Sequence, residues 1–201
     1  MPTDSGTAVA ATNVRAAIVS PSKLAHFVLR TGRYAMMLDW YKTVLNATPA
    51  FENGGLAFLC YDDEHHRVAL LNIPTLTDQP EGAAGVHHIA FTYASLTDLL
   101  ENFERLGMLG INPVYTINHG PTTSLYYADP DQNQLEFQVE NFDTVEESGK
   151  FFFSAAFAEN PIGVEIDPAD LLRRLRAGES GALLKTRPDD GARTLADVKL
   201  R

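Results

Sequence analysis

The stretch VHHIAFTYASLTDLLENFERLG, residues 86–107, predicts a short strand followed directly by an amphipathic helix. Apolar residues recur at helical spacing after the strand and give the helix one apolar side, formed by Leu96, Leu99, Leu100, Phe103 and Leu106. Ser95 is a suitable N-cap, and Gly107 is a suitable residue to end the helix. Residues 86–107 therefore supply the first two elements of a βα unit.

The same order of elements occurs earlier in the chain. KLAHFVLR, residues 23–30, alternates as a strand does, and YAMMLDWYKTVL, residues 34–45, carries apolar side chains at helical spacing. Short apolar runs separated by polar turns follow each helix, among them GLAFLCY, RVALLNI, SLYYADP and QLEFQVE. We therefore predict an α+β fold of two βαβββ units that form one curved mixed sheet.

Length and charge exclude several classes of protein. The chain has 201 residues, of which 45% are hydrophobic, enough for one domain with a core. The net charge of −10 disfavours binding to nucleic acid or to anionic membranes. The sequence shows neither a signal-peptide pattern nor a run of apolar residues long enough for a membrane span, so we expect a cytoplasmic protein without a membrane partner.

Changes in composition suggest four segments. We expect a flexible N-terminal arm over residues 1–22 and a single domain over residues 23–142, with its two units at 23–80 and 84–142. Residues 143–178 are expected to form a packed C-terminal extension with a short helix, capped by Asp167 with Pro168 at its first position. The remaining residues, 179–201, are expected to form a mobile tail.

Three side chains could bind one metal ion, and two of them stand at matching places in the two units. His26 and His88 lie in the opening strands of the two units, and Glu136 lies on the last strand of the second unit. Alternation sends Glu136 away from the core side of its strand, where a carboxylate needs a partner. Two imidazoles and one carboxylate are typical of non-haem Fe(II) centres with open positions. Only one histidine of the doublet His87–His88 can face such a site, because neighbouring strand residues point to opposite faces.

These motifs resemble the vicinal oxygen chelate superfamily and, within it, the one-domain type I extradiol ring-cleaving dioxygenases. LAHFVLRT resembles the first ligand strand, which implies that His26 is a metal ligand. VHHIAF resembles the second ligand strand and implies His88 as ligand, and YADPDQNQLEF resembles the segment that carries the carboxylate ligand, here Glu136. The resemblance implies the vicinal oxygen chelate fold, with the curved sheet built around the metal site.

The resemblance also implies roles for three more residues. EHHRVALL resembles a stretch that carries the acid–base catalyst, which implies this role for His66. NHGPTTSLYY resembles a segment whose histidine and tyrosine bind the substrate, here His119 and Tyr126. The expected reaction is extradiol cleavage of a catechol-type, bicyclic aromatic diol such as 2,3-dihydroxybiphenyl by O₂. The expected cofactor is Fe(II), and Mn(II) accepts the same ligands.

Other functions on the same fold are the alternatives. A glyoxalase needs a fourth protein ligand, usually a Glu at the end of the first unit. The corresponding run in this chain, RVALLNIP, contains no carboxylate. A thiol transferase would keep the three metal ligands without needing His66, His119 and Tyr126. A metal-free ligand-sequestering protein would not need the three ligands. We also expect a homo-oligomer, in which a dimer would serve stability or pocket closure because one chain contains both units.

Overall fold

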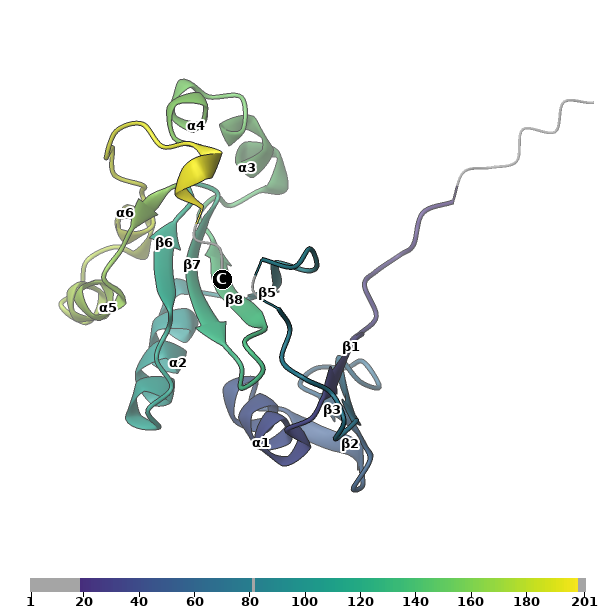
Figure 1. The fold of residues 1–201 in the computed structure, drawn as a ribbon. Helices are drawn as coiled ribbons and strands as arrows, with labels where there is room; N and C mark the ends of the chain where they lie inside the picture. Colours follow the sequence, from purple (N-terminus) through teal and green to yellow (C-terminus); the bar gives the residue numbers. More distant parts are fainter. Residues whose placement is uncertain (1–18, 81, 199–201) are drawn as a thin grey trace, which may run out of the picture.

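The computed structural model describes residues 19–80 and 82–198, so most of the expected N-terminal arm lies outside the described residues. The first unit contains a four-stranded sheet, called here the first sheet, with the order β1-β4-β3-β2. Its elements are β1 (Phe27–Thr31), α1 (Tyr34–Val44), β2 (Thr48–Glu52), β3 (Leu56–Cys60) and β4 (Val68–Asn72). In Figure 1 this unit occupies the lower right of the molecule.

The second unit repeats this arrangement and extends it. Its five-stranded sheet, called here the second sheet, has the order β5-β8-β7-β6-β9. The elements are β5 (His88–Thr92), α2 (Leu96–Met108), β6 (Tyr115–Asn118), β7 (Thr122–Ala128), β8 (Gln134–Glu140) and β9 (Val164–Glu165). In both units the first strand pairs parallel with the fourth, and the other pairs are antiparallel. The α+β class and the two βαβββ units are therefore confirmed.

The single curved sheet that the sequence suggested is not what the structure shows. The strands form two mixed sheets, with β1 and β5 at the end of their respective sheets. β1 also begins later than expected, at Phe27, because the ladder to β4 starts at the pair Phe27–Val68. His26 therefore precedes the strand and lies in the segment that leads into it.

The N-terminal cap of α2 is the one predicted from the sequence, but the C-terminal end of the helix is not. The Ser95 side chain accepts a hydrogen bond from the backbone N–H of Asp98, as expected for an N-cap. The helix does not end at Gly107 but continues to Met108. Gly110, two residues after the last helical residue, adopts a φ of 77°, a left-handed conformation that favours glycine at the end of a helix.

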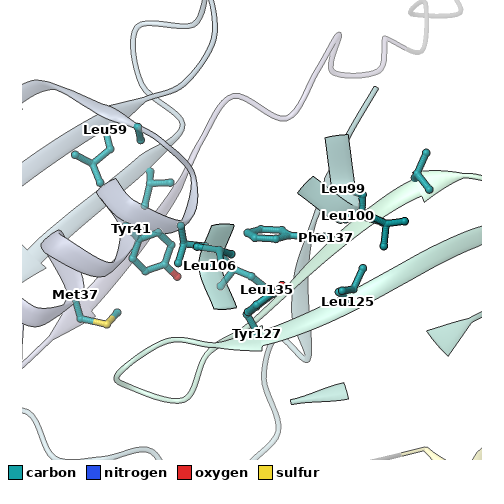
Figure 2. Close-up of a cluster of buried hydrophobic side chains, with 14 of the residues drawn as sticks. Met37, Tyr41, Leu59, Leu99, Leu100, Leu106, Leu125, Tyr127, Leu135 and Phe137 are labelled. Atoms are coloured by element: carbon teal, nitrogen blue, oxygen red, sulfur yellow. The ribbon is translucent and has the colours of Figure 1, made fainter. Parts of the chain in front are cut away.

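One hydrophobic core joins the two units. It combines side chains of α1 and α2 with the helix-facing side chains of both sheets, and Figure 2 shows Tyr41, Leu106, Leu135 and Phe137 within it. Two polar contacts reinforce this junction. The Tyr41 hydroxyl lies 3.0 Å from a carboxylate oxygen of Asp129, and Arg105 donates to the backbone oxygen of Thr43. The shared core fixes the position of one unit relative to the other.

The C-terminal segment packs against the second unit. It forms α3 (Val145–Phe151), α4 (Ala155–Glu159), α5 (Pro168–Arg176), α6 (Gly181–Leu184) and a 3-10 turn, η1 (Leu195–Asp197). The expected cap of α5 is present, since Asp167 accepts from two backbone N–H groups. Residues 179–198 do not extend freely as a tail: Leu184 is 5% exposed, and Arg187 donates to the backbone oxygen of Asn160. Within residues 19–80 and 82–198, the structure contains no helix suited to crossing a membrane.

Replacing Phe137 by Ala is expected to lower the free energy of unfolding by about 3–5 kcal/mol, because the ring is fully buried and its loss leaves a cavity. Phe153→Ala is the matched control, since Phe153 is 92% exposed and its change should stay within about 0.5 kcal/mol. Urea denaturation followed by circular dichroism measures both variants. Similar small losses for the two would show that Phe137 is not part of the core.

Candidate metal centre

The polar site lies on the face of the second sheet opposite α2, called here the site face. In β8, Leu135 and Phe137 point into the core, so the residue between them points to the site face. That residue is Glu136, which is only 5% exposed although it is a carboxylate. Tyr126 of β7 is its register partner and lies beside it on the same face. The strand alternation read from the sequence therefore places Glu136 as predicted.

Glu136 is surrounded by hydrogen-bonding groups. Its Oε2 lies 3.0 Å from Nε2 of His88, and its Oε1 lies 3.9 Å from Nε2 of His119. Burial raises the pKa of Glu136, but hydrogen bonds with His88 and Ser124 and the nearby His119 outweigh burial, so the pKa is lowered overall. These contacts favour the charged carboxylate at neutral pH.

The geometry around His119 determines which ring nitrogen carries its hydrogen. Nδ1 lies 2.5 Å from the backbone oxygen of Ile162, which can only accept, so Nδ1 is the donor. In the neutral ring Nε2 is then an acceptor, and it lies 3.0 Å from the hydroxyl of Tyr126. Burial lowers the pKa of His119 and outweighs the opposing effects of the Ile162 carbonyl and the charge of Glu136. A neutral imidazole that accepts from Tyr126 is therefore favoured.

Tyr126 contacts His119, Glu136 and His88. Its ring lies edge-on to the His88 ring with centroids 5.3 Å apart, and its hydroxyl interacts with both His119 and Glu136. Burial first, and then the negative charge of Glu136, raises the pKa of Tyr126 well above its ordinary value. Tyr126 therefore stays protonated and remains a hydrogen-bond donor.

His88, His119 and Tyr126 line a cavity of about 400 Å³. Its polar lining comes from His87, His88, His119, Tyr126 and Gln134, and its other lining residues are Val114, Tyr115, Pro161, Ile162 and Val198. The volume falls in the range of pockets that bind small organic molecules. The arrangement combines a few convergent polar groups with an apolar wall, as a site for an aromatic ligand requires.

The other two predicted site residues lie just before strands β1 and β4 of the first sheet. The rings of His26 and His66 are 4.3 Å apart, and the His66 ring lies 4.7 Å from that of Phe58. His26 is exposed. Burial lowers the pKa of His66, and the neighbouring His26 and His65 lower it further. His26 and His66 therefore form a second group of imidazoles.

The structure thus divides the six predicted residues into two groups. Glu136, His88, His119 and Tyr126 lie together at the second sheet, and His26 and His66 lie together beside the first. Over the described ranges, no three His, Cys, Asp or Glu side chains are grouped so that they could hold a metal ion. The three-ligand assignment remains a prediction.

In each histidine doublet the two rings contact each other, whereas strand alternation predicts that they point to opposite faces. Nδ1 of His87 lies 2.8 Å from Nδ1 of His88, and Nδ1 of His65 lies 2.5 Å from Nδ1 of His66. The rings meet because β5 begins only at His88 and both residues of the other doublet precede β4, so the pleat of a strand does not separate them. His87 and His65 are therefore neighbours that can orient His88 and His66.

Sequence reasoning missed the contribution of the C-terminal segment. Pro161, Ile162 and Val198 form part of the cavity wall, and the Ile162 carbonyl holds His119. The only signal in the sequence was that the segment is apolar enough to pack on the domain. Ser124, which hydrogen-bonds Glu136, carried no signal of its own.

Comparison with known proteins identifies relatives over most of the chain. Biphenyl-2,3-diol 1,2-dioxygenase 2 of Rhodococcus globerulus is 48% identical over 157 residues, which cover 78% of this chain and 83% of that protein. Biphenyl-2,3-diol 1,2-dioxygenase 3 of Rhodococcus globerulus is 41% identical over 167 residues, covering 82% of this chain and 88% of that protein.

Solved structures agree with the fold. A glyoxylase/bleomycin resistance protein/dioxygenase domain from Frankia sp. EAN1pec has a TM-score of 0.52 at 20% identity, and covers 62% of this chain and 96% of its own. A glyoxalase/dioxygenase from Nostoc punctiforme also has a TM-score of 0.52, at 16% identity, and covers 68% and 99%. Residues 23–137 match the Glyoxalase/Bleomycin resistance protein/Dioxygenase superfamily. The chain therefore belongs to the Glyoxalase/Bleomycin resistance protein/Dioxygenase superfamily.

Proposed function

We propose that the chain is an extradiol ring-cleaving dioxygenase that uses Fe(II) and O₂ to open a bicyclic aromatic diol such as 2,3-dihydroxybiphenyl. The names of the two Rhodococcus relatives support the reaction and the substrate class. The observation that carries the proposal is the buried pair of Glu136 and His88, which lies beside the cavity together with His119 and Tyr126. A cytoplasmic location remains a prediction from the sequence.

Glu136 and His88 are of the chemical types that a divalent metal of the non-haem iron type binds. Glu136 and His88 offer a carboxylate oxygen and an imidazole nitrogen 3.0 Å apart, and His26 is the proposed third ligand. Ala69 of the first sheet is the residue equivalent to Glu136 of the second sheet. In the parallel pair of each sheet, Ala69 lies opposite Val28, and Glu136 lies opposite Ala90. The first unit therefore lacks the carboxylate that a glyoxalase would use as its fourth ligand.

The residues around the cavity would bind and orient the diol. When bound, the metal would supply coordination for the two diol oxygens and for O₂ and would lower the pKa of the first hydroxyl. Tyr126, held protonated, has one hydroxyl hydrogen, which would turn from Nε2 of His119 to a deprotonated diol oxygen when the diol binds. The apolar wall at Pro161 and Ile162 would contact the second ring. Both atoms of O₂ enter the ring-opened product, so no further reductant is needed.

His66 is the proposed acid–base catalyst. It would accept the proton of one diol hydroxyl and later return a proton to the oxygen that develops negative charge. A lowered pKa suits the first of these steps, because the imidazole is then neutral at physiological pH and able to accept. His65 contacts Nδ1 of His66 and would leave the opposite nitrogen, Nε2, free for the substrate.

The direct test of this function is ring cleavage by iron-loaded protein. The protein is reconstituted anaerobically with Fe(II), then mixed with O₂ and with catechol, 2,3-dihydroxybiphenyl or 1,2-dihydroxynaphthalene. A yellow ring-opened product is expected, with the bicyclic diols turned over more efficiently than catechol because the cavity wall is apolar. Absence of colour with every diol, although iron is bound, would refute the proposed reaction.

Glu136→Gln is expected to weaken Fe(II) binding by about 100-fold or more, because the change removes a charged ligand while keeping its size. Glu140→Gln is the matched control, since Glu140 lies on the same strand and face but is exposed. Iron retained after desalting, measured by mass spectrometry, compares the two. Full retention by Glu136→Gln would remove Glu136 from the ligand set.

His66→Phe is expected to keep its iron and lose about 100-fold or more in kcat, because it removes the proton-transfer group and keeps a ring of similar size. His65→Ala serves as the control and should reduce kcat only mildly, because the His65 side chain is 68% exposed. Steady-state oxygen uptake gives kcat, and iron analysis gives occupancy. Unchanged turnover in His66→Phe would exclude this residue as the catalyst.

A further inference from the structure

The segment of residues 160–165 lies directly against the backbone that carries His119. In β9, Val164 pairs with Asn118, the residue before His119. Gly163 has a φ of 118°, and a Cβ at this position would lie 2.4 Å from the backbone oxygen of Asn118 and 2.8 Å from Cα of His119. Only a residue without a side chain can make this approach. The backbone of the segment is therefore close enough to contact the His119 ring.

The side chain of Asn160 holds the turn that begins this segment. Asn160 is only 3% exposed. Its Oδ1 accepts hydrogen bonds from the backbone N–H groups of Ile162 and Gly163, at 3.1 and 2.7 Å. Its Nδ2 donates to the backbone oxygens of Gly163 and Gly191, at 3.1 and 3.2 Å. The amide of Asn160 therefore uses both its oxygen and its nitrogen to fix the backbone of the turn.

One peptide group links Asn160 to His119. The N–H of Gly163 and the C=O of Ile162 belong to the same planar peptide, and in a trans peptide the two point in opposite directions. Oδ1 of Asn160 holds the N–H, and the C=O lies 2.5 Å from Nδ1 of His119. Asn160 therefore turns the Ile162 carbonyl toward the His119 ring.

Arg187 keeps the two backbones together. Its Nη1 donates to the backbone oxygen of Asn160, at 2.8 Å, and to that of His119, at 3.3 Å. The guanidinium also lies over the Phe151 ring, 5.1 Å from the ring centroid. Arg187 thus holds the turn in place, while Asn160 sets the direction of its peptide groups.

The direction of the Ile162 carbonyl decides what His119 offers to the cavity. With the hydrogen on Nδ1, Nε2 accepts from the Tyr126 hydroxyl. With the hydrogen on Nε2, this nitrogen would donate to the hydroxyl oxygen instead. The single hydrogen of Tyr126 would then turn to Glu136, its other hydrogen-bond partner, and would occupy the carboxylate that is the proposed metal ligand.

We propose that Asn160 is a positioning residue of the ring-cleavage reaction. Through the Ile162–Gly163 peptide it keeps the hydrogen of His119 on Nδ1, and this leaves the hydrogen of Tyr126 available to the diol. The proposal rests on the proposed function for the role of Tyr126 toward the diol. The position of the His119 hydrogen does not depend on that function and can be measured separately.

Nuclear magnetic resonance of ¹⁵N-labelled imidazoles reports which ring nitrogen carries the hydrogen. The full chain is freed of metal by chelation and measured above the ordinary pKa of histidine, where the rings are neutral. Signals that are missing from His119→Phe identify His119. The wild type should carry its hydrogen on Nδ1. In Asn160→Ala the ratio of the Nδ1–H form to the Nε2–H form should fall about fivefold or more, the effect of losing one ordinary hydrogen bond.

Two outcomes of this measurement would overturn the proposal. One is an unchanged ratio in folded Asn160→Ala. The other is wild-type His119 with its hydrogen on Nε2, which would decide the matter whether or not the variant folds.

Asn160→Ser and Asn72→Ala are the matched variants. Serine keeps an acceptor for the turn, so Asn160→Ser should retain more of the Nδ1–H form than Asn160→Ala. Asn72→Ala removes an amide that donates to the backbone oxygen of Gly54 in the first unit, and it should leave the ratio at the wild-type value. An equal fall in Asn72→Ala, or a ratio as low in Asn160→Ser as in Asn160→Ala, would contradict the role of the turn.

Gly163→Ala tests the same peptide from the backbone. Its Cβ would collide with the backbone of Asn118, so the segment must move and the ratio should fall as in Asn160→Ala. Gly178→Ala is the control, because Gly178 also has a positive φ, 91°, but a Cβ there would meet no atom within 4 Å. An unchanged ratio in folded Gly163→Ala would contradict the role of the peptide.

Oxygen uptake by the iron-loaded proteins separates this proposal from the proposed function. For a bicyclic diol, kcat/KM should fall about fivefold in Asn160→Ala and stay at the wild-type value in Asn72→Ala. A shifted ratio with unchanged kcat/KM would overturn the positioning role in the reaction. Absence of diol cleavage in the wild type, together with a shifted ratio in Asn160→Ala, would contradict the dioxygenase and support the action of Asn160 on His119.

Discussion

A charged carboxylate in a protein interior costs several kcal/mol unless other groups replace the water it loses. Glu136 is only 5% exposed, and polar side chains surround its carboxylate. His88 contacts one carboxylate oxygen, His119 lies near the other, and Ser124 forms a hydrogen bond with the carboxylate. The strand pattern of β8 forces this position, since Leu135 and Phe137 on either side are needed for the core. Burial first, and then the negative charge of Glu136, raises the pKa of Tyr126 and keeps the tyrosine protonated.

The two units share one topology and differ in the chemistry of one face. The positions of Glu136 and Tyr126 in the second sheet are occupied by Ala69 and Phe58 in the first. The first unit therefore provides an imidazole pair on an apolar surface, and the second provides the carboxylate and the tyrosine. Under the proposed assignment, this asymmetry would give one imidazole ligand from the first unit and an imidazole and a carboxylate from the second, which would leave positions for substrate and O₂.

The sequence predicted the repeated units and the strand face of Glu136 because both depend on local periodicity. It also placed Tyr126, His119 and His88 in one site, through resemblance to a known family, and the structure brings these three together with Glu136. Other features depend on how the units pack, which no local pattern encodes. The separation of the two sheets follows from the shared core, and the role of Ile162 follows from the path of the C-terminal segment across the second sheet.

We propose that His26, His88 and Glu136 hold one Fe(II). A crystal structure of anaerobically Fe(II)-loaded protein, with anomalous difference maps at the iron edge, tests it most directly. We expect one iron peak within coordination distance of His26, His88 and Glu136. A peak coordinated by His88 and Glu136 but not by His26 would contradict the ligand assignment.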